Sequence, residues 1–162
     1  MFPALWLIPR EIVEAAGPWN ETLSEAPGED AEYFTRVLLS ANKVLFSPGA
    51  RCYYRSGIAT SVSRNKSSRA WKCQMRVIEL CQKHVLAREN TARVRRGFAL
   101  SWQHFAHACY PYVPELAERA LANARALHAV TISPYAGPGF NLVSALVGWR
   151  IARRLQVATG RS

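Results

Sequence analysis

The sequence predicts a small α/β region followed by an all-α extension. In the first 65 residues, short runs rich in β-branched and aromatic residues alternate with short helical patterns. Beyond that point the apolar residues recur at helical spacing over long stretches. With 162 residues, 49% of them hydrophobic, the chain is long enough to fold around one packed core. We therefore divide it into a first region (1–65), a helical extension (66–130) and a Pro/Gly linker with a basic amphipathic tail (131–162).

The first region predicts three strands and two helices. "ALWLI" is typical of a short buried strand near 4–8, and "PREIVEAAGP" predicts a helix over 10–16 that starts after Pro9 and stops at Gly17-Pro18. A second helix is expected over 30–41, because apolar residues recur at helical spacing after two acids. "KVLFSPG" and "ARCYYRS" predict strands at 43–47 and 51–55, joined by a turn at Pro48-Gly49.

The rest of the chain predicts helices only. Long patterns cover roughly 69–88, 92–109 and 114–128, with prolines marking the boundary between the last two. After the linker "TISPYAGPG", the tail from Phe140 onwards predicts one apolar helix that ends in several arginines. The tail is expected to lie on a surface, either that of the other helices or that of an anionic membrane.

The chain is strongly basic, with a formal net charge of +10 and a pI near 10.0. No acid occurs between Glu32 and Glu79, while nine lysines and arginines do. Such a run is typical of a solvated face, but it also indicates an anionic partner: nucleic acid, a membrane surface or a phosphorylated small molecule. No helix-turn-helix, zinc-finger or aromatic RNA-binding pattern is found, so nucleic acid is not favoured.

Cysteine usage and hydropathy indicate a reducing compartment. The four cysteines form no CxxC pair and lie on apolar stretches, as buried thiols do. "MFPALWLIPR" lacks the features of a signal peptide, and no run reaches the length of a membrane span. The chain is therefore expected to be cytoplasmic, with a peripheral position at the inner face of the membrane as an option. The four histidines stand in helical patterns without carboxylates at ligand spacing, so none is assigned to a metal.

Asp30, which directly follows Glu29, is the only aspartate of the chain. Asp is a favoured N-cap, and acids in the first turn stabilise a helix, so capping alone could explain its place. The other interpretation is chemical: a carboxylate at a helix N-terminus is held ionised by backbone N–H groups, which suits a general base.

An ordered series of features resembles the C-terminal half of the catalytic domain of bacterial family 2 glycosyltransferases. The series consists of a strand and short helix ending in Gly17, the pair Glu29-Asp30, Arg36 six residues later, and the "YYR" of residues 53–55. The resemblance implies a partial GT-A-type nucleotide-diphospho-sugar transferase fold, followed by the helical extension of a bacterial subgroup. The implied reaction is inverting transfer of a sugar from a nucleotide-sugar to a hydroxyl acceptor.

The resemblance also implies roles for individual residues. Asp30 would be the base that takes the proton of the acceptor hydroxyl. Glu29 would shape the acceptor side, and Arg55 and Ser56 would lie over the donor diphosphate. Arg36 and Tyr54 would be structural residues near the site, with Arg36 anchoring its helix.

One departure from that family is large. Its donor-binding half ends in an acidic DxD-type motif that holds Mg or Mn, and a chain with a single aspartate has no such motif. We therefore expect no metal or other cofactor in this chain, and no sugar transfer by the chain alone. The partners of the parent enzyme would be a nucleotide-sugar and a glycan or lipid-linked acceptor. The alternatives are a non-catalytic basic helical protein that binds nucleic acid or a membrane surface, and an interaction remnant that has lost the chemistry.

Overall fold

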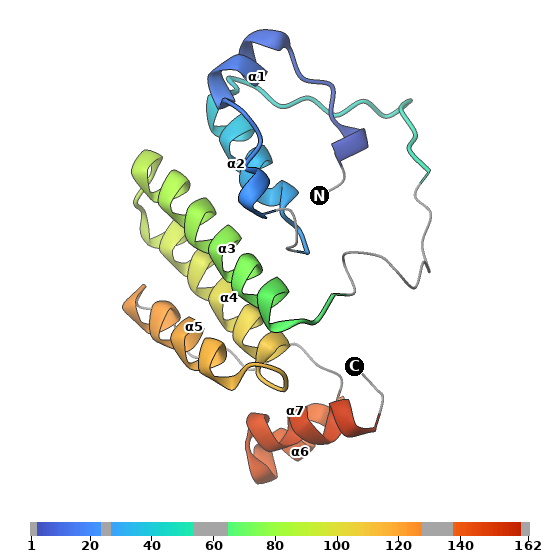
Figure 1. Ribbon diagram of the computed structural model, residues 1–162, viewed down its shortest axis with the longest axis vertical. Helices are drawn as coiled ribbons and strands as arrows, with labels where there is room; N and C mark the ends of the chain where they lie inside the picture. The colour runs from blue at the N-terminus through green and yellow to red at the C-terminus, as the bar shows by residue number, and fades with distance from the viewer. Residues whose placement is uncertain (1–2, 24–26, 54–64, 128–137, 160–162) are drawn as a thin grey trace. The chain divides into compact units, whose positions relative to one another are not determined.

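The computed structural model describes residues 3–23, 27–53, 65–127 and 138–159 (Figure 1). Within these ranges the chain forms seven α-helices and two short 3₁₀ helices, η1 (Pro3–Leu5) and η2 (Glu21–Leu23), and no β-strand. The prediction of an α/β fold with short strands is therefore wrong, because the described chain is all-helical. It divides into two compact units, residues 1–90 and residues 91–162.

The expected strands at 43–47 and 51–55 are replaced by irregular chain as far as residue 53, where this described range ends. The turn at Pro48-Gly49 is present, since the Ala50 N–H donates to the Ser47 carbonyl at 3.3 Å. Val44 and Phe46, however, are 61% and 89% exposed. β-Branched and aromatic residues favour a strand only where a neighbouring strand accepts its backbone hydrogen bonds. None of the described segments supplies such a neighbour.

The same reason applies to the expected strand near 4–8. Its first residues form η1, and residues 6–9 are irregular, with Leu7 99% exposed. These described segments therefore form no sheet edge that could pair with a second chain. The apolar side chains of these segments are nevertheless open to solvent.

The first unit is built from α1 (Arg10–Ala16), α2 (Asp30–Ser40) and α3 (Ser68–Arg88), with α2 against both of the others. Helix α3 begins at a true cap, because the Ser67 hydroxyl accepts from the Ala70 N–H at 3.1 Å. Leu23 of η2 and Val77 of α3 are both buried, and Ala31, Cys73, Leu80 and Cys81 pack against them. This small apolar core fixes α3 beside the start of α2.

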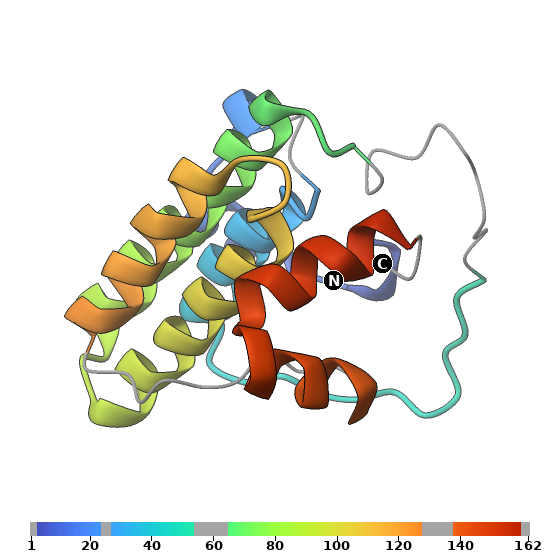
Figure 2. The same ribbon diagram turned by 90° about the horizontal axis from the view of Figure 1, so that it is seen from below.

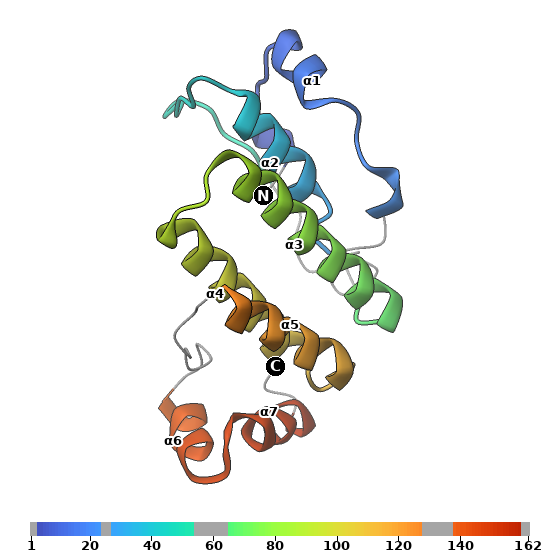
Figure 3. The ribbon, with the colours of Figure 1, turned by 90° about the vertical axis from the view of Figure 1, so that its left-hand side faces the viewer.

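The second unit begins with a helical hairpin of α4 (Ala92–Cys109) and α5 (Pro114–Ala126), which lie side by side (Figures 1 and 3). Thr91 caps α4 through its hydroxyl, and Pro114 occupies the first turn of α5, where a missing N–H is tolerated. Trp102 and Phe105 of α4 are buried, as are the small residues Ala117 and Ala120 of α5. Small residues on one helix allow close approach of the other.

The tail forms two helices instead of the single one expected. Helices α6 (Pro138–Val147) and α7 (Trp149–Ala158) pack against each other and meet at a corner (Figure 2). Gly148 stands at that corner with φ +80°, a left-handed conformation that residues with a side chain rarely adopt. The sequence pattern continued across Gly148, so the break depends on this one residue.

Candidate functional site

The residues that the sequence singled out first, Glu29 and Asp30, lie at the start of α2. Gly28 precedes them with φ +79°, and its carbonyl accepts from the Ala31 N–H at 3.0 Å, so a tight turn leads directly into the helix. Glu29 holds the N-cap position but makes no side-chain capping bond. Asp30 is the first helical residue and is buried, with 7% of its surface exposed. The positive end of the α2 dipole therefore lies at the Asp30 carboxylate.

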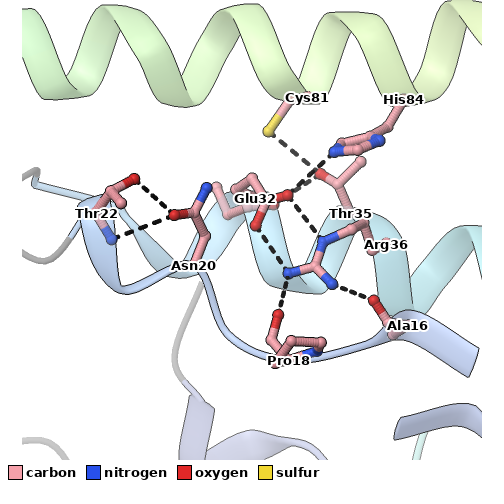
Figure 4. A network of polar contacts seen from close by, with 10 residues as sticks. Ala16, Pro18, Asn20, Thr22, Glu32, Thr35, Arg36, Cys81 and His84 are labelled. Atoms are coloured by element: carbon pink, nitrogen blue, oxygen red, sulfur yellow. Dashed lines mark hydrogen bonds and ion pairs between the residues drawn. The ribbon is translucent and has the colours of Figure 1, made fainter. Parts of the chain in front are cut away.

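Arg36 ties α2 to the end of α1 (Figure 4). Its Nη2 donates to the Pro18 carbonyl at 2.8 Å, and its Nη1 donates to the Ala16 carbonyl. The chain between these two carbonyls turns at Gly17, which has φ +74°. A single guanidinium thus satisfies carbonyls on both sides of the turn that ends α1. Because of this double contact, α2 and the end of α1 hold a fixed spacing.

The same guanidinium is paired with Glu32. Arg36 Nε lies 2.8 Å from Glu32 Oε1 and Nη2 lies 3.0 Å from Oε2, a two-pronged contact within one turn of α2. The carboxylate is almost completely enclosed, with 4% of its side chain exposed. Burial alone would raise the pKa of Glu32, but hydrogen bonds and charge from Arg36 and His84 outweigh it and hold the pKa below its usual value.

His84 reaches the same carboxylate from α3. Its Nε2 lies 3.0 Å from Glu32 Oε1 (Figure 4), so the ring donates to the ionised carboxylate through that nitrogen. No carboxylate stands at ligand spacing from His84 in the sequence, and this contact with Glu32 was not predicted. Glu32 stands 52 positions earlier in the chain, and sequence spacing predicts contacts only between residues that are close in sequence. The Glu32–Arg36 pair, at helical (i, i+4) spacing, was the one readable signal of this network.

Cys81 also faces this network. The Thr35 hydroxyl lies 3.4 Å from the Cys81 sulfur and 2.7 Å from the Ala31 carbonyl, to which it donates. Burial raises the pKa of the Cys81 thiol, and the nearby Glu32 raises it further, although the contact with Thr35 opposes this. The raised pKa favours the protonated thiol over the thiolate.

The structure therefore separates two kinds of carboxylate on α2. Glu32 is fully engaged by Arg36 and His84 and holds three segments together. Asp30 stands one half-turn earlier, at the N-terminal end of the helix. The predicted structural residue Arg36 lies beside Glu32, while Tyr54, Arg55 and Ser56 fall outside the described residues, so their predicted roles stay predictions.

The described residues also bear on the metal and membrane predictions. Among the described residues, no three His, Cys, Asp or Glu side chains come together in a group that could hold a metal ion. None of the helices in the described ranges is both long and apolar enough to cross a bilayer.

No protein-family model, curated protein or solved structure matches this chain. The proposed identification as the C-terminal half of a family 2 glycosyltransferase is contradicted on the same grounds as the fold. The strands of a partial GT-A-type fold are not formed in the described ranges, and no family model supports the resemblance.

Proposed function

We propose that this chain carries the acceptor side of an inverting sugar transfer, with Asp30 as the general base. The proposal rests on the chemistry at the start of α2. The single observation that carries it is the position of Asp30: the only aspartate of the chain is the first residue of a helix that is clamped in place. A general base has to be held in one geometry, which the clamped start of α2 favours.

In the proposed step, the Asp30 carboxylate accepts the proton of an acceptor hydroxyl. The freed oxygen attacks the anomeric carbon of a nucleotide-sugar from the face opposite the nucleotide. The bond between that carbon and the diphosphate oxygen breaks, and the nucleoside diphosphate leaves with the electron pair. Inversion follows because attack and departure occur on opposite faces.

The charge of the chain supports the phosphate side of this proposal. Between Glu32 and Glu79 the sequence has nine lysines and arginines and no acid. A diphosphate leaving group develops negative charge, which a cationic segment stabilises. The divalent metal of comparable sugar transfers does not fit the described residues, which have no suitable cluster of ligands. No step of the proposal therefore uses a metal.

Binding of an acceptor is the direct test. Isotope-labelled protein would be titrated with a panel of oligosaccharides, with backbone amide shifts as the readout. We expect at least one acceptor to shift the amides of Gly28 to Ala31 in a saturable manner. Asp30→Asn should weaken that binding about tenfold or more, since a hydrogen bond to a charged group is lost. Asn is also a good helix-start residue, so folding should be retained.

Glu21→Gln is the matched control, because Glu21 is an exposed acid in η2 and its loss changes the charge equally. It should leave acceptor binding unchanged. The proposal fails if no oligosaccharide shifts the amides at the start of α2. It also fails if Asp30→Asn and Glu21→Gln bind the acceptor equally well, because the Asp30 carboxylate would then not touch it.

A further inference from the structure

Helix α7 has one face packed on the rest of its unit. The Trp149 ring lies 4.5 Å from the His107 ring and 5.1 Å from the Tyr110 ring, measured between ring centroids. Ala152, one turn later, is only 3% exposed. Arg153 Nε donates to the His107 carbonyl at 3.2 Å. This face of α7 is therefore fixed on the C-terminal end of α4.

The opposite face of α7 is open and carries both aliphatic and cationic side chains. Ile151 and Leu155, one turn apart, are 50% and 52% exposed. Arg150 and Arg154 precede them by one position each and lie at the border between the open and the packed face, with their guanidinium groups 5.9 and 5.3 Å from the centroid of the Tyr110 ring. Arg150 Nη2 pairs with Glu118 at 2.5 Å across an exposed surface, a contact of little net strength in water.

Helix α6 extends the open aliphatic surface. Leu142 and Leu146 are 67% and 77% exposed, and Val143 and Val147 beside them are 37% and 44% exposed. These four residues follow (i, i+4) spacing and so share one side of the helix. The sequence of α6 contains no charged residue at all. Isolated exposed aliphatic residues are ordinary, but two adjoining helices with this many of them indicate an interaction surface.

Apart from Glu118, which pairs with Arg150, the charge around this surface is positive. No acidic residue follows Glu118 in the sequence, while Arg150, Arg153 and Arg154 all lie in α7. An aliphatic face bordered by arginines is complementary to a bilayer that carries anionic lipids, because hydrocarbon lies directly below the phosphate layer. A nucleic acid would satisfy the arginines but would leave the aliphatic face of α6 in water.

We propose that α6 and α7 dock together on the surface of an anionic lipid bilayer. Leu142, Leu146, Ile151 and Leu155 enter the boundary between headgroups and acyl chains. Arg150 and Arg154 extend to the lipid phosphates. Trp149 stays against His107 and Tyr110, so the helices bind without leaving their own unit. This inference is independent of the proposed sugar transfer.

Vesicle co-sedimentation of the full chain tests the proposal. The vesicles would be made of phosphatidylcholine, with or without phosphatidylserine, and circular dichroism would show that each variant is folded. We expect binding to the anionic vesicles and little binding to the neutral ones. Arg154→Gln should weaken the binding about fivefold, the usual contribution of one cation near an anionic bilayer. Leu142→Ser with Leu146→Ser should weaken it by at least about tenfold, because aliphatic surface is lost.

Two variants outside the tail are matched controls. Arg96→Gln removes an exposed arginine of α4, and Leu45→Ser removes a side chain that is 75% exposed in the first unit. Both should bind anionic vesicles like the parent chain. Equal binding to neutral and anionic vesicles would overturn the proposal, as would equal losses in tail and control variants. A third result would also overturn it: the parent chain does not bind vesicles but dimerises as its concentration rises, and the double leucine variant does not dimerise. The surface would then be occupied by a second copy of the chain.

Discussion

Replacement of Glu32 by Gln should lower the stability of the first unit by about 3 kcal/mol. The substitution keeps the shape of the side chain but removes its charge. One of the two oxygens becomes an NH₂ group, so a donor faces either Arg36 or His84, which are both donors. Losing one partner of a buried ion pair costs about 3 to 5 kcal/mol. We expect the lower end, because Arg36 keeps its bonds to the Ala16 and Pro18 carbonyls and 17% of its side chain is exposed.

Hydrogen exchange in increasing urea would measure this loss separately in each unit. Peptides from α2 should lose protection in Glu32→Gln, while peptides from α5 should not change. Glu79→Gln is the control: its partner Arg76 is 60% exposed, so the change should cost less than about 1 kcal/mol.

The stability that Glu32 contributes to the first unit should also depend on pH. The folded pKa of Glu32 is lower than the 4.5 of an unperturbed Glu, so the unfolded chain binds the proton more readily. The stability that Glu32 contributes is therefore present above about pH 4.5 and is lost as the pH falls through the lower folded pKa. Glu32→Gln should lack this acid-dependent part. The reasoning is refuted if Glu32→Gln lowers the free energy of unfolding by no more than Glu79→Gln does, since the buried pair would then contribute no more than a surface pair.

Three further outcomes are expected. Gly17→Ala should destabilise the first unit by about 1 to 2 kcal/mol in urea unfolding, because φ is +74° at that position. Gly97→Ala should stabilise the second unit slightly, because Gly97 lies within α4 with open space around it. Equal effects of the two substitutions would contradict this. Burial, with charge from His104 and Arg153, lowers the pKa of His107 from 6.5 to about 4, so the second unit should lose stability as the pH falls from 6.5 to about 4. The loss should be on the order of 1 to 2 kcal/mol, because solvent screens the exposed part of the ring. His107→Phe should abolish most of that loss in acid titrations followed by circular dichroism, and His104→Gln should not. Purified protein of residues 1–162 should release no nucleoside diphosphate from nucleotide-sugars in the presence of acceptors, because the proposal gives this chain only the acceptor side of the transfer. Turnover would show that a donor site exists.

The sequence was a good guide to the helices and a poor one to the strands. Helix α1 is found between Pro9 and Gly17 as expected, because a proline at the start and a glycine at the end act locally. The same holds for α3, whose start is set by the Ser67 cap. Residues 43–47 have a local preference for strand, but a strand also needs a distant partner, which no local pattern can guarantee.

In the candidate site, too, contacts within one helix could be predicted from the sequence and contacts between helices could not. The positions of Glu29 and Asp30 at a helix start, and the pairing of Glu32 with Arg36, follow from spacing within one helix. The contact of His84 with Glu32 does not, because it depends on how α3 lies against α2. The corner at Gly148 was missed for a different reason: glycine is tolerated within helices, so its presence alone does not predict a break.

The α4–α5 pair and the α2–α3 pair are joined by connections of different length, and this affects the order in which they fold. Four residues separate α4 from α5, whereas 27 residues separate α2 from α3. The entropy of closing the longer connection exceeds that of the shorter by about 1.7 kcal/mol. The α4–α5 hairpin should therefore form early in folding, on its own, while the buried Glu32–His84 contact forms late. During synthesis on a ribosome, the N-terminal part of the chain emerges first. The Glu32 carboxylate of α2 is nevertheless not enclosed until α3 has emerged as well. During that interval the apolar faces of α1 and α2 are open to chaperones.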